Sequence, residues 1–113
     1  MRNNTIDYVE FKAHNLQQIK EFYTAVFSWT FTDYGTNYIA FTDSGLSGGF
    51  ELTTDPIVNG VLVVLYHDNL EEVQAKIVEA GGKIVAPIFE FPGGKRFQFL
   101  DPSGNELAVW TDK

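Results

Sequence analysis

Two stretches of the chain carry apolar residues at the three- and four-residue spacing of an amphipathic helix. The first covers residues 15–28 and the second covers residues 69–80. Asn15 and Asn69 stand where a side-chain oxygen can cap the first turn, and Gly81 follows the second stretch as a left-handed cap can. The pattern therefore predicts two helices with defined ends.

Segments of alternating or continuous apolar character flank each helix and predict eight strands. The expected strands cover residues 6–11, 30–33, 37–42 and 49–53 in the first half, and 60–66, 83–91, 95–100 and 106–110 in the second. Each half thus has the order strand, helix, strand, strand, strand.

The two halves also resemble each other in sequence. The cap and apolar positions of the first helix recur in the second at one constant offset, from Asn15 to Asn69 and from Tyr23 to Ile77. The segment 41–45, Phe-Thr-Asp-Ser-Gly, resembles 99–104, Phe-Leu-Asp-Pro-Ser-Gly. We interpret this as a duplication. It predicts one domain made of two βαβββ modules, residues 1–56 and 57–113.

Composition narrows the choice of partners. The chain has 113 residues, 44% of them hydrophobic, which is enough for one packed core. Its net charge of −7 disfavours nucleic acid and anionic membranes as partners. The absence of cysteine excludes disulfides and thiolate chemistry. No apolar run is long enough for a membrane span or a signal peptide, so we expect a soluble, cytoplasmic protein.

Side chains alternate between the two faces of a strand, so odd and even positions can be assigned to a face covered by the helices and to the opposite face. The opposite face is predicted to hold Ile6, Tyr8, Glu10, Glu51, Thr53, Leu62, Val64, Tyr66, Glu106, Ala108 and Trp110. Arg96 and Gln98 alternate onto the same side. This face is too apolar for open solvent, so we expect it to line a partly enclosed cavity.

Three segments, in this order and spacing, resemble the vicinal oxygen chelate superfamily, which includes glyoxalase I, bleomycin-resistance proteins and extradiol dioxygenases. They are Glu21–Trp29, with Ser28 in place of the family's glycine, Ala80–Lys83 and Asp101–Asn105. The resemblance covers essentially the whole chain. It implies an α+β fold in which the two modules form an open, cupped mixed sheet, usually in a dimer, with a divalent metal held by up to four strand residues.

The metal positions of the glyoxalase I-like members fall on Tyr8, Glu51, Leu62 and Ala108. Of these only Glu51 is an ordinary ligand, because a neutral tyrosine binds poorly and leucine and alanine have no donor atom. His14 and His67 are expected at the surface or rim. We therefore predict no metal and no cofactor, with a shifted site on Glu10 and Glu51 as the alternative.

The candidate catalytic residues are Glu51, Glu10 and Tyr8. A carboxylate in apolar surroundings has its charged form disfavoured, which favours a general base, and Tyr8 would donate or orient the proton. The candidate ligand-binding residues are Leu62, Val64, Tyr66, Arg96, Gln98, Ala108 and Trp110. The simpler alternative is that each glutamate bonds a neighbouring hydroxyl or amide and the aromatic side chains only line the cavity.

Residues 93–96, Gly-Gly-Lys-Arg, form either an anion-binding rim or a hairpin turn with a solvated basic edge.

Three functions remain open: a metal-independent lyase or isomerase, a non-catalytic binder of a drug or metabolite of the bleomycin-resistance type, and an interaction module with a vestigial cleft. The expected partner is a small organic molecule. The expected assembly is a homodimer, because half-sheets leave open edges.

Overall fold

The computed structural model describes residues 3–113 and confirms the predicted α+β order of elements. The elements are β1 (Tyr8–Ala13), α1 (Leu16–Phe27), β2 (Thr30–Asp33), β3 (Tyr38–Thr42), β4 (Ser47–Leu52), β5 (Val63–Tyr66), α2 (Leu70–Glu79), β6 (Lys83–Phe91), β7 (Gly94–Leu100) and β8 (Glu106–Thr111). Among these residues no helix has both the length and the apolar character that a membrane span requires.

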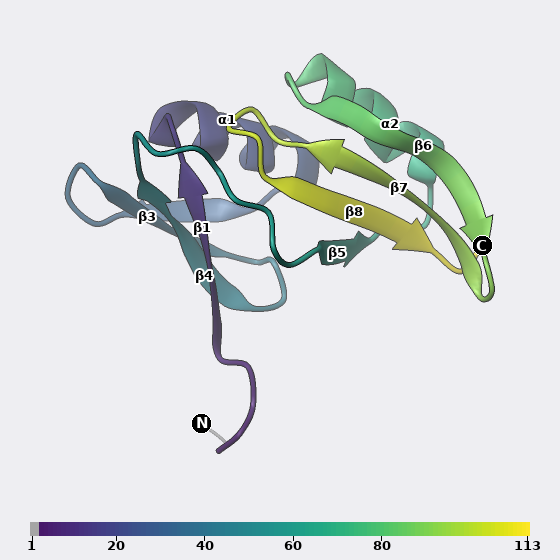
Figure 1. Ribbon diagram of the computed structural model, residues 1–113, viewed down its shortest axis with the longest axis horizontal. Helices are drawn as coiled ribbons and strands as arrows, with labels where there is room; N and C mark the ends of the chain where they lie inside the picture. Colours follow the sequence, from purple (N-terminus) through teal and green to yellow (C-terminus); the bar gives the residue numbers. More distant parts are fainter. Residues whose placement is uncertain (1–2) are drawn as a thin grey trace.

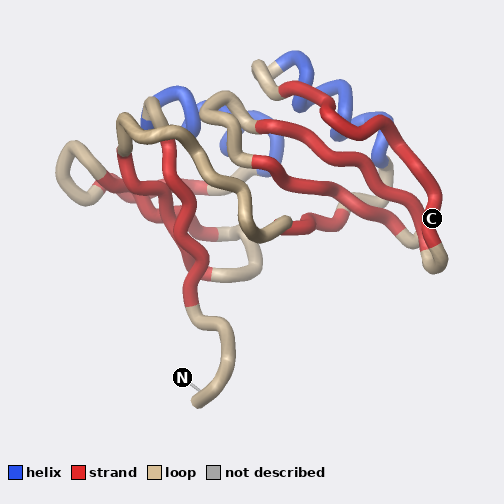
Figure 2. The backbone as a smooth tube through the Cα atoms, in the orientation of Figure 1, coloured by secondary structure: helices blue, strands red, loops and turns tan. Residues whose placement is uncertain are grey.

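Each module forms its own four-stranded mixed sheet (Figure 1). The strand order is β1-β4-β3-β2 in the first sheet and β5-β8-β7-β6 in the second. In both sheets the first and last strands of the module pair in parallel, and the remaining pairs are antiparallel. Both helices lie along one side of the pair of sheets (Figure 2). The opposite faces are therefore left free of helices.

Several strand ends differ from the prediction by one to three residues, and those of β1 and β5 bear on the site. β1 continues past Phe11, because Lys12 and Ala13 still pair with β4. β5 begins only at Val63, because the chain before it contacts β8 through a side chain: Asn59 donates to the carbonyl of Gly104 and accepts from the amide of Glu106, each at 3.0 Å. The extension of β1 matters for the site, since it carries Lys12 onto the helix-free face.

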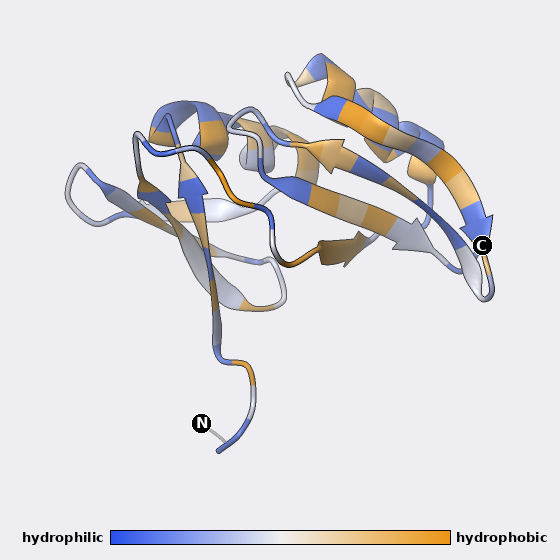
Figure 3. Cartoon of the chain, viewed as in Figure 1, coloured by the Kyte–Doolittle hydropathy of each residue, from blue (hydrophilic) through white to orange (hydrophobic). Residues whose placement is uncertain are grey.

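Both helices begin at the predicted asparagine caps. The Asn15 side chain accepts from the amide of Gln18 at 2.9 Å, and the Asn69 side chain accepts from the amide of Glu72 at 3.1 Å. The C-cap of α1, Ser28, has φ +62°, a left-handed conformation that suits glycine better. Hydrophobic and hydrophilic residues alternate around α2, which turns its apolar stripe to the core (Figure 3).

The core is shared between the modules, and α1 contributes to both. The ring of Tyr23 stacks on Trp29 at 4.7 Å within the first module. The ring of Phe22 lies 6.1 Å from Phe99, which belongs to β7 of the second. All four of these aromatic side chains are at least 95% buried. The helix of the first module therefore packs against the sheet of the second.

A turn of the second module, residues 101–105, bonds directly to the first. The buried carboxylate of Asp101 accepts from the Tyr23 hydroxyl at 2.9 Å and from the amides of Ser103 and Asn105 at 2.9 and 3.0 Å. The Asn105 side chain donates to the carbonyl of Lys12 at 2.8 Å. We call this segment the 101–105 clasp. It connects the modules at a place where the described strands do not pair.

Candidate functional site

The helix-free face of the first sheet carries a network of five polar side chains, which we call the polar network. Its members are Tyr8, Glu10 and Lys12 on β1, Tyr38 on β3 and Glu51 on β4. The hydroxyls of Tyr8 and Tyr38 are 2.5 Å apart. The Lys12 ammonium donates to Glu51 and lies 3.4 Å from Glu10, so one cation joins the two predicted catalytic carboxylates.

One ammonium lies between two carboxylates in the polar network. The hydrogen bond that Lys12 donates to Glu51 and the further contact with Glu10 raise the pKa of the Lys12 amine. Burial and the hydrogen bond with Tyr8 raise the pKa of Tyr38 well above its usual range. The side chains of Lys12, Glu10 and Glu51 are all between 42% and 50% exposed. The network can therefore offer a cation and hydroxyl donors to a ligand, but both carboxylates already have a partner.

Lys12 and Tyr38 are two members of this face that the sequence analysis missed. The predicted first strand ended at Phe11, so Lys12 was assigned to no face. The alternation of Val9, Phe11 and Ala13 on the core side was the signal that could have placed it, because it continues two residues beyond the predicted end. Tyr38 pairs in register with Glu51, which is visible only once the strand pairing is known.

The helix-free face of the second sheet is instead aromatic, and we call it the aromatic row. Tyr66 on β5 meets Trp110 on β8 edge to face at 5.3 Å. Trp110 lies 6.4 Å from Phe91 on β6. Between them the guanidinium of Arg96 on β7 stands 5.9 Å from the Phe91 ring and 5.2 Å from Phe89. The row therefore crosses all four strands of this sheet.

The remaining predicted ligand residues lie around the aromatic row. Gln98 donates to Glu106 at 2.7 Å, so its amide is engaged within the sheet. Ala108 pairs in register with Val64 and Gln98 and is completely buried. Leu62 precedes β5 and belongs to no strand. Tyr66 donates to Asp112 at 2.6 Å, which raises the pKa of Tyr66 and lowers that of Asp112.

The four positions that would carry a metal do not form a donor set for one. Leu62 and Ala108 have no donor atom, the Tyr8 hydroxyl bonds Tyr38, and Glu51 is held by an ammonium. Across residues 3–113, nowhere do three or more His, Asp or Glu side chains gather as metal ligands would. The residues present therefore do not fit a divalent metal.

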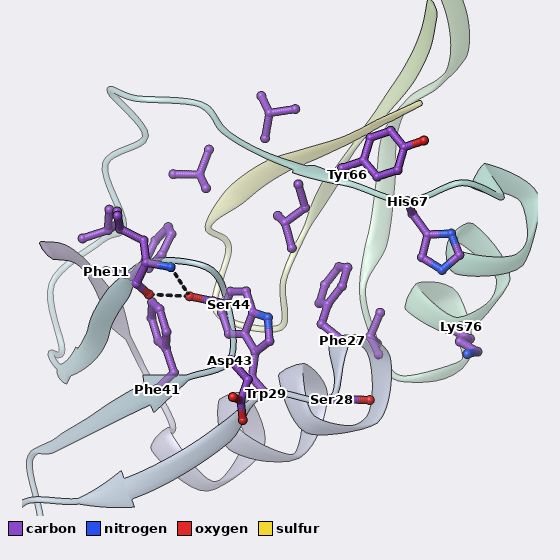
Figure 4. Close-up of a pocket in the computed structure, with 16 residues that line it drawn as sticks. Phe11, Phe27, Ser28, Trp29, Phe41, Asp43, Ser44, Tyr66, His67 and Lys76 are labelled. Atoms are coloured by element: carbon purple, nitrogen blue, oxygen red, sulfur yellow. Dashed lines mark hydrogen bonds between the residues drawn. The ribbon is translucent and has the colours of Figure 1, made fainter. Parts of the chain in front are cut away.

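Two cavities lie in the gap between the modules. One, of about 690 Å³, is walled by Phe11 and Phe41 on one side and by Tyr66 and His67 on the other, with the end of α1 beneath (Figure 4). The other, of about 720 Å³, is lined by Tyr8, Glu10 and Lys12, by the linker 55–61 and by Glu106. Residues of β1 and β5 line both cavities. The gap is thus bordered by the unpaired edges of these two strands.

Within one chain the predicted site residues form two groups. Tyr8, Glu10 and Glu51 share the first sheet, whereas Tyr66, Arg96, Gln98, Ala108 and Trp110 share the second. Neither of the two cavities is lined by Glu51 together with Ala108 or Trp110. The convergence of residues 8, 51, 62 and 108 on one cavity stays a prediction.

Comparison with known proteins gives a consistent family match. The model of the Glyoxalase/Bleomycin resistance protein/Dioxygenase superfamily matches residues 5–109. A Mycobacterium tuberculosis protein named "Putative glyoxylase CFP32" is 27% identical over 123 aligned positions, which cover 96% of this chain and 46% of that protein. The chain therefore spans about half the length of the curated relatives it matches.

Solved structures are similar in fold at low sequence identity. A glyoxalase/bleomycin resistance protein/dioxygenase family enzyme from Burkholderia phytofirmans superposes with a TM-score of 0.82 at 16% identity, over 96% of this chain and all of that one. The fosfomycin resistance protein FosX from Listeria monocytogenes gives 0.82 at 12% identity, over 97% and 94% of the two chains. At such identities the similarity establishes the fold alone.

Proposed function

Because this chain belongs to the Glyoxalase/Bleomycin resistance protein/Dioxygenase superfamily, we propose that it is a glyoxalase-like small-molecule-binding protein that acts without a divalent metal. The observation that carries the proposal is the position of Lys12. Its ammonium engages Glu51, the one ordinary metal ligand among the four family positions. A metal ion there would have to displace a bonded cation and would find no donor at Leu62 or Ala108.

Metal analysis tests this proposal directly. The protein is purified with zinc, nickel, manganese or iron supplied, desalted, and analysed for bound metal. We expect much less than one ion per protomer, and the shift in melting temperature caused by a bound small molecule should be unchanged by EDTA. E51Q is the matched variant. Stoichiometric metal that is present in the wild type and lost in E51Q would contradict the proposal.

A catalytic form of the same function is the second candidate, a metal-independent lyase or isomerase. The polar network supports it, because two hydroxyls, an ammonium and two carboxylates lie on one face. In this candidate Glu10 or Glu51 accepts a proton from a carbon acid after the ligand draws Lys12 away, and Tyr8 or Tyr38 donates to the developing oxygen.

Proton exchange separates the two candidates. In deuterated water, an enzyme of this kind exchanges the proton next to the carbonyl of a small hydroxyketone, as followed by NMR. The double variant E10Q/E51Q should lose the exchange while still binding a neutral ligand. If the wild-type protein binds small molecules but catalyses no exchange, the catalytic candidate is wrong and the binding function is the one that remains.

Assembly as a homodimer is part of the proposal. The unpaired edges of β1 and β5 support it, because an open edge strand is usually covered in a stable protein. A second copy also offers a way to bring the polar network of one chain opposite the aromatic row of the other. A cytoplasmic location is proposed on the composition alone.

A further inference from the structure

Arg96 is a half-buried cation that has no carboxylate partner among the described residues. The ion pairs of residues 3–113 involve Lys12, Lys20, His67 and Lys76, and Arg96 is in none of them. Its Nε atom is buried and has no hydrogen-bond partner. In a chain with 15 acidic and 8 basic residues, a half-buried arginine without an acidic partner is unexpected.

The arginine is nevertheless held in place. Phe89 and Phe91 lie 5.2 and 5.9 Å from its guanidinium carbon, the range of a cation–π contact. Such contacts fix the plane of the guanidinium without using its hydrogen atoms. The two Nη atoms also have no hydrogen-bond partner among the described residues, and together they can bind a carboxylate with two parallel hydrogen bonds.

The surroundings of Arg96 add a second requirement, for an aromatic ligand. Trp110 pairs in register with Arg96, and Tyr66 lies edge to face against Trp110 and is 50% exposed. Glu106 and Asp112 bond Gln98 and Tyr66 instead, and Asp68, which also acts on Tyr66, lies 3.5 Å from His67. Nothing described on the face neutralises the arginine, and the flat side chains beside it offer a stacking surface.

We propose that the aromatic row binds a planar aromatic carboxylate, with the ring against Trp110 and Tyr66 and the carboxylate on the Arg96 fork. The inference rests on the proposed small-molecule function and names its ligand class. The net charge of the chain by itself favours a cationic or neutral ligand. Arg96 reverses that preference locally, because a contact at hydrogen-bond distance outweighs screened charges farther away.

The test compares two probes of equal shape, naphthoate and its neutral amide, by calorimetry, with quenching of fluorescence measured in a W29F background in which Trp110 is the remaining tryptophan. We expect the wild-type protein to bind naphthoate at least about tenfold more tightly than naphthamide, the effect of a charge-assisted hydrogen bond. R96M should abolish this preference and still bind naphthamide. R96K should keep part of it, because lysine retains the charge but not the planar fork.

Lys95 provides the matched control. It is the neighbouring cation on β7, and alternation turns it to the opposite face, so K95M should keep the full preference for naphthoate. Equal affinity of the wild-type protein for the two probes, or a preference that persists in R96M, would overturn the anion assignment. If neither probe binds, the assignment of an aromatic ligand to this face fails, whereas the proposed small-molecule function is decided separately by metal analysis and proton exchange. If R96M does not fold, R96K, which keeps the positive charge, still allows the comparison of the two probes.

Discussion

The two modules use the same turn in opposite ways. In the first, Asp43 lies on an exposed turn with φ +70° and accepts one hydrogen bond, from the Thr30 hydroxyl at 3.0 Å. In the second, the equivalent Asp101 is 4% exposed and anchors the clasp between the modules. The two segments are therefore similar in sequence but not in backbone conformation, since Asp101 lacks the positive φ of Asp43, and the position of each copy in the domain decides whether its aspartate is buried.

The helix-free faces differ in the same manner. The first sheet presents charged and hydroxyl groups, and the second presents aromatic rings and one arginine. These residues alternate along the strands with core residues that are apolar in both modules. The duplication thus preserves the half of each strand that packs, and the other half has diverged.

The largest expected effect comes from removing the buried aspartate. D101A leaves the Tyr23 hydroxyl and three backbone amides without their acceptor, and should lower the free energy of unfolding by about 3 kcal/mol or more. D43N, whose side chain still suits the left-handed backbone at φ +70°, should cost no more than about 0.5 kcal/mol, as at other exposed sites. Urea unfolding measures both. Similar losses in the two variants would show that the turns are used alike after all.

The next largest effect is expected at alkaline pH, where the buried contact of Tyr23 with the clasp should make the stability of the protein depend on pH. Burial, followed by the nearby Asp101 charge, raises the pKa of Tyr23, so the folded protein keeps a proton that the unfolded chain releases near pH 10. Stability must then fall as pH rises above about 10, by up to about 1.4 kcal/mol per pH unit from this group.

The slope of stability against pH is the readout for Tyr23, since Y23F also removes a hydrogen bond. Y23F should make the slope above pH 10 less steep, and part of it should remain because the pKa values of Tyr38 and Tyr66 are also raised. Y34F is the control and should leave the slope unchanged, because Tyr34 is 63% exposed and its surroundings change little on folding. An equal slope in wild type and Y23F would place the alkaline sensitivity elsewhere.

The smallest expected effects lie where the modules are alike. N15A and N69A each remove one capping hydrogen bond of 2.9 to 3.1 Å and should each cost about 1 kcal/mol in chemical unfolding. The two losses should agree, because both caps are exposed and have the same geometry. A much larger loss for N15A would mean that α1, which packs on both modules, amplifies a local defect.

Most of the fold follows from the sequence because its signals are local. The apolar stripes of both helices, the asparagine caps and the order of helices and strands along the chain are confirmed. The clasp has no such signal: Tyr23 and Asp101 are 78 residues apart, and only the packed modules bring them together. Ends of strands are also poorly marked, which is why β1 was predicted to stop before Lys12.

The candidate site was only partly predictable for two physical reasons. The alternation of side chains along a strand places each one on a face, but it does not say which groups bond to each other. The ion pairs of Glu10 and Glu51 with Lys12 were therefore not predicted. The alternation also fails where a strand is irregular. The register of β6 shifts between Ala86 and Phe89, and this brings Phe89 onto the same face as Arg96.

Lys12 takes part in both modules at once. Its carbonyl accepts from Asn105 of the clasp, and its ammonium holds Glu10 and Glu51. The backbone that the clasp anchors is thus the backbone that positions the ammonium between the two carboxylates. The placement of one cation on the first sheet therefore shares a residue with the junction between the modules.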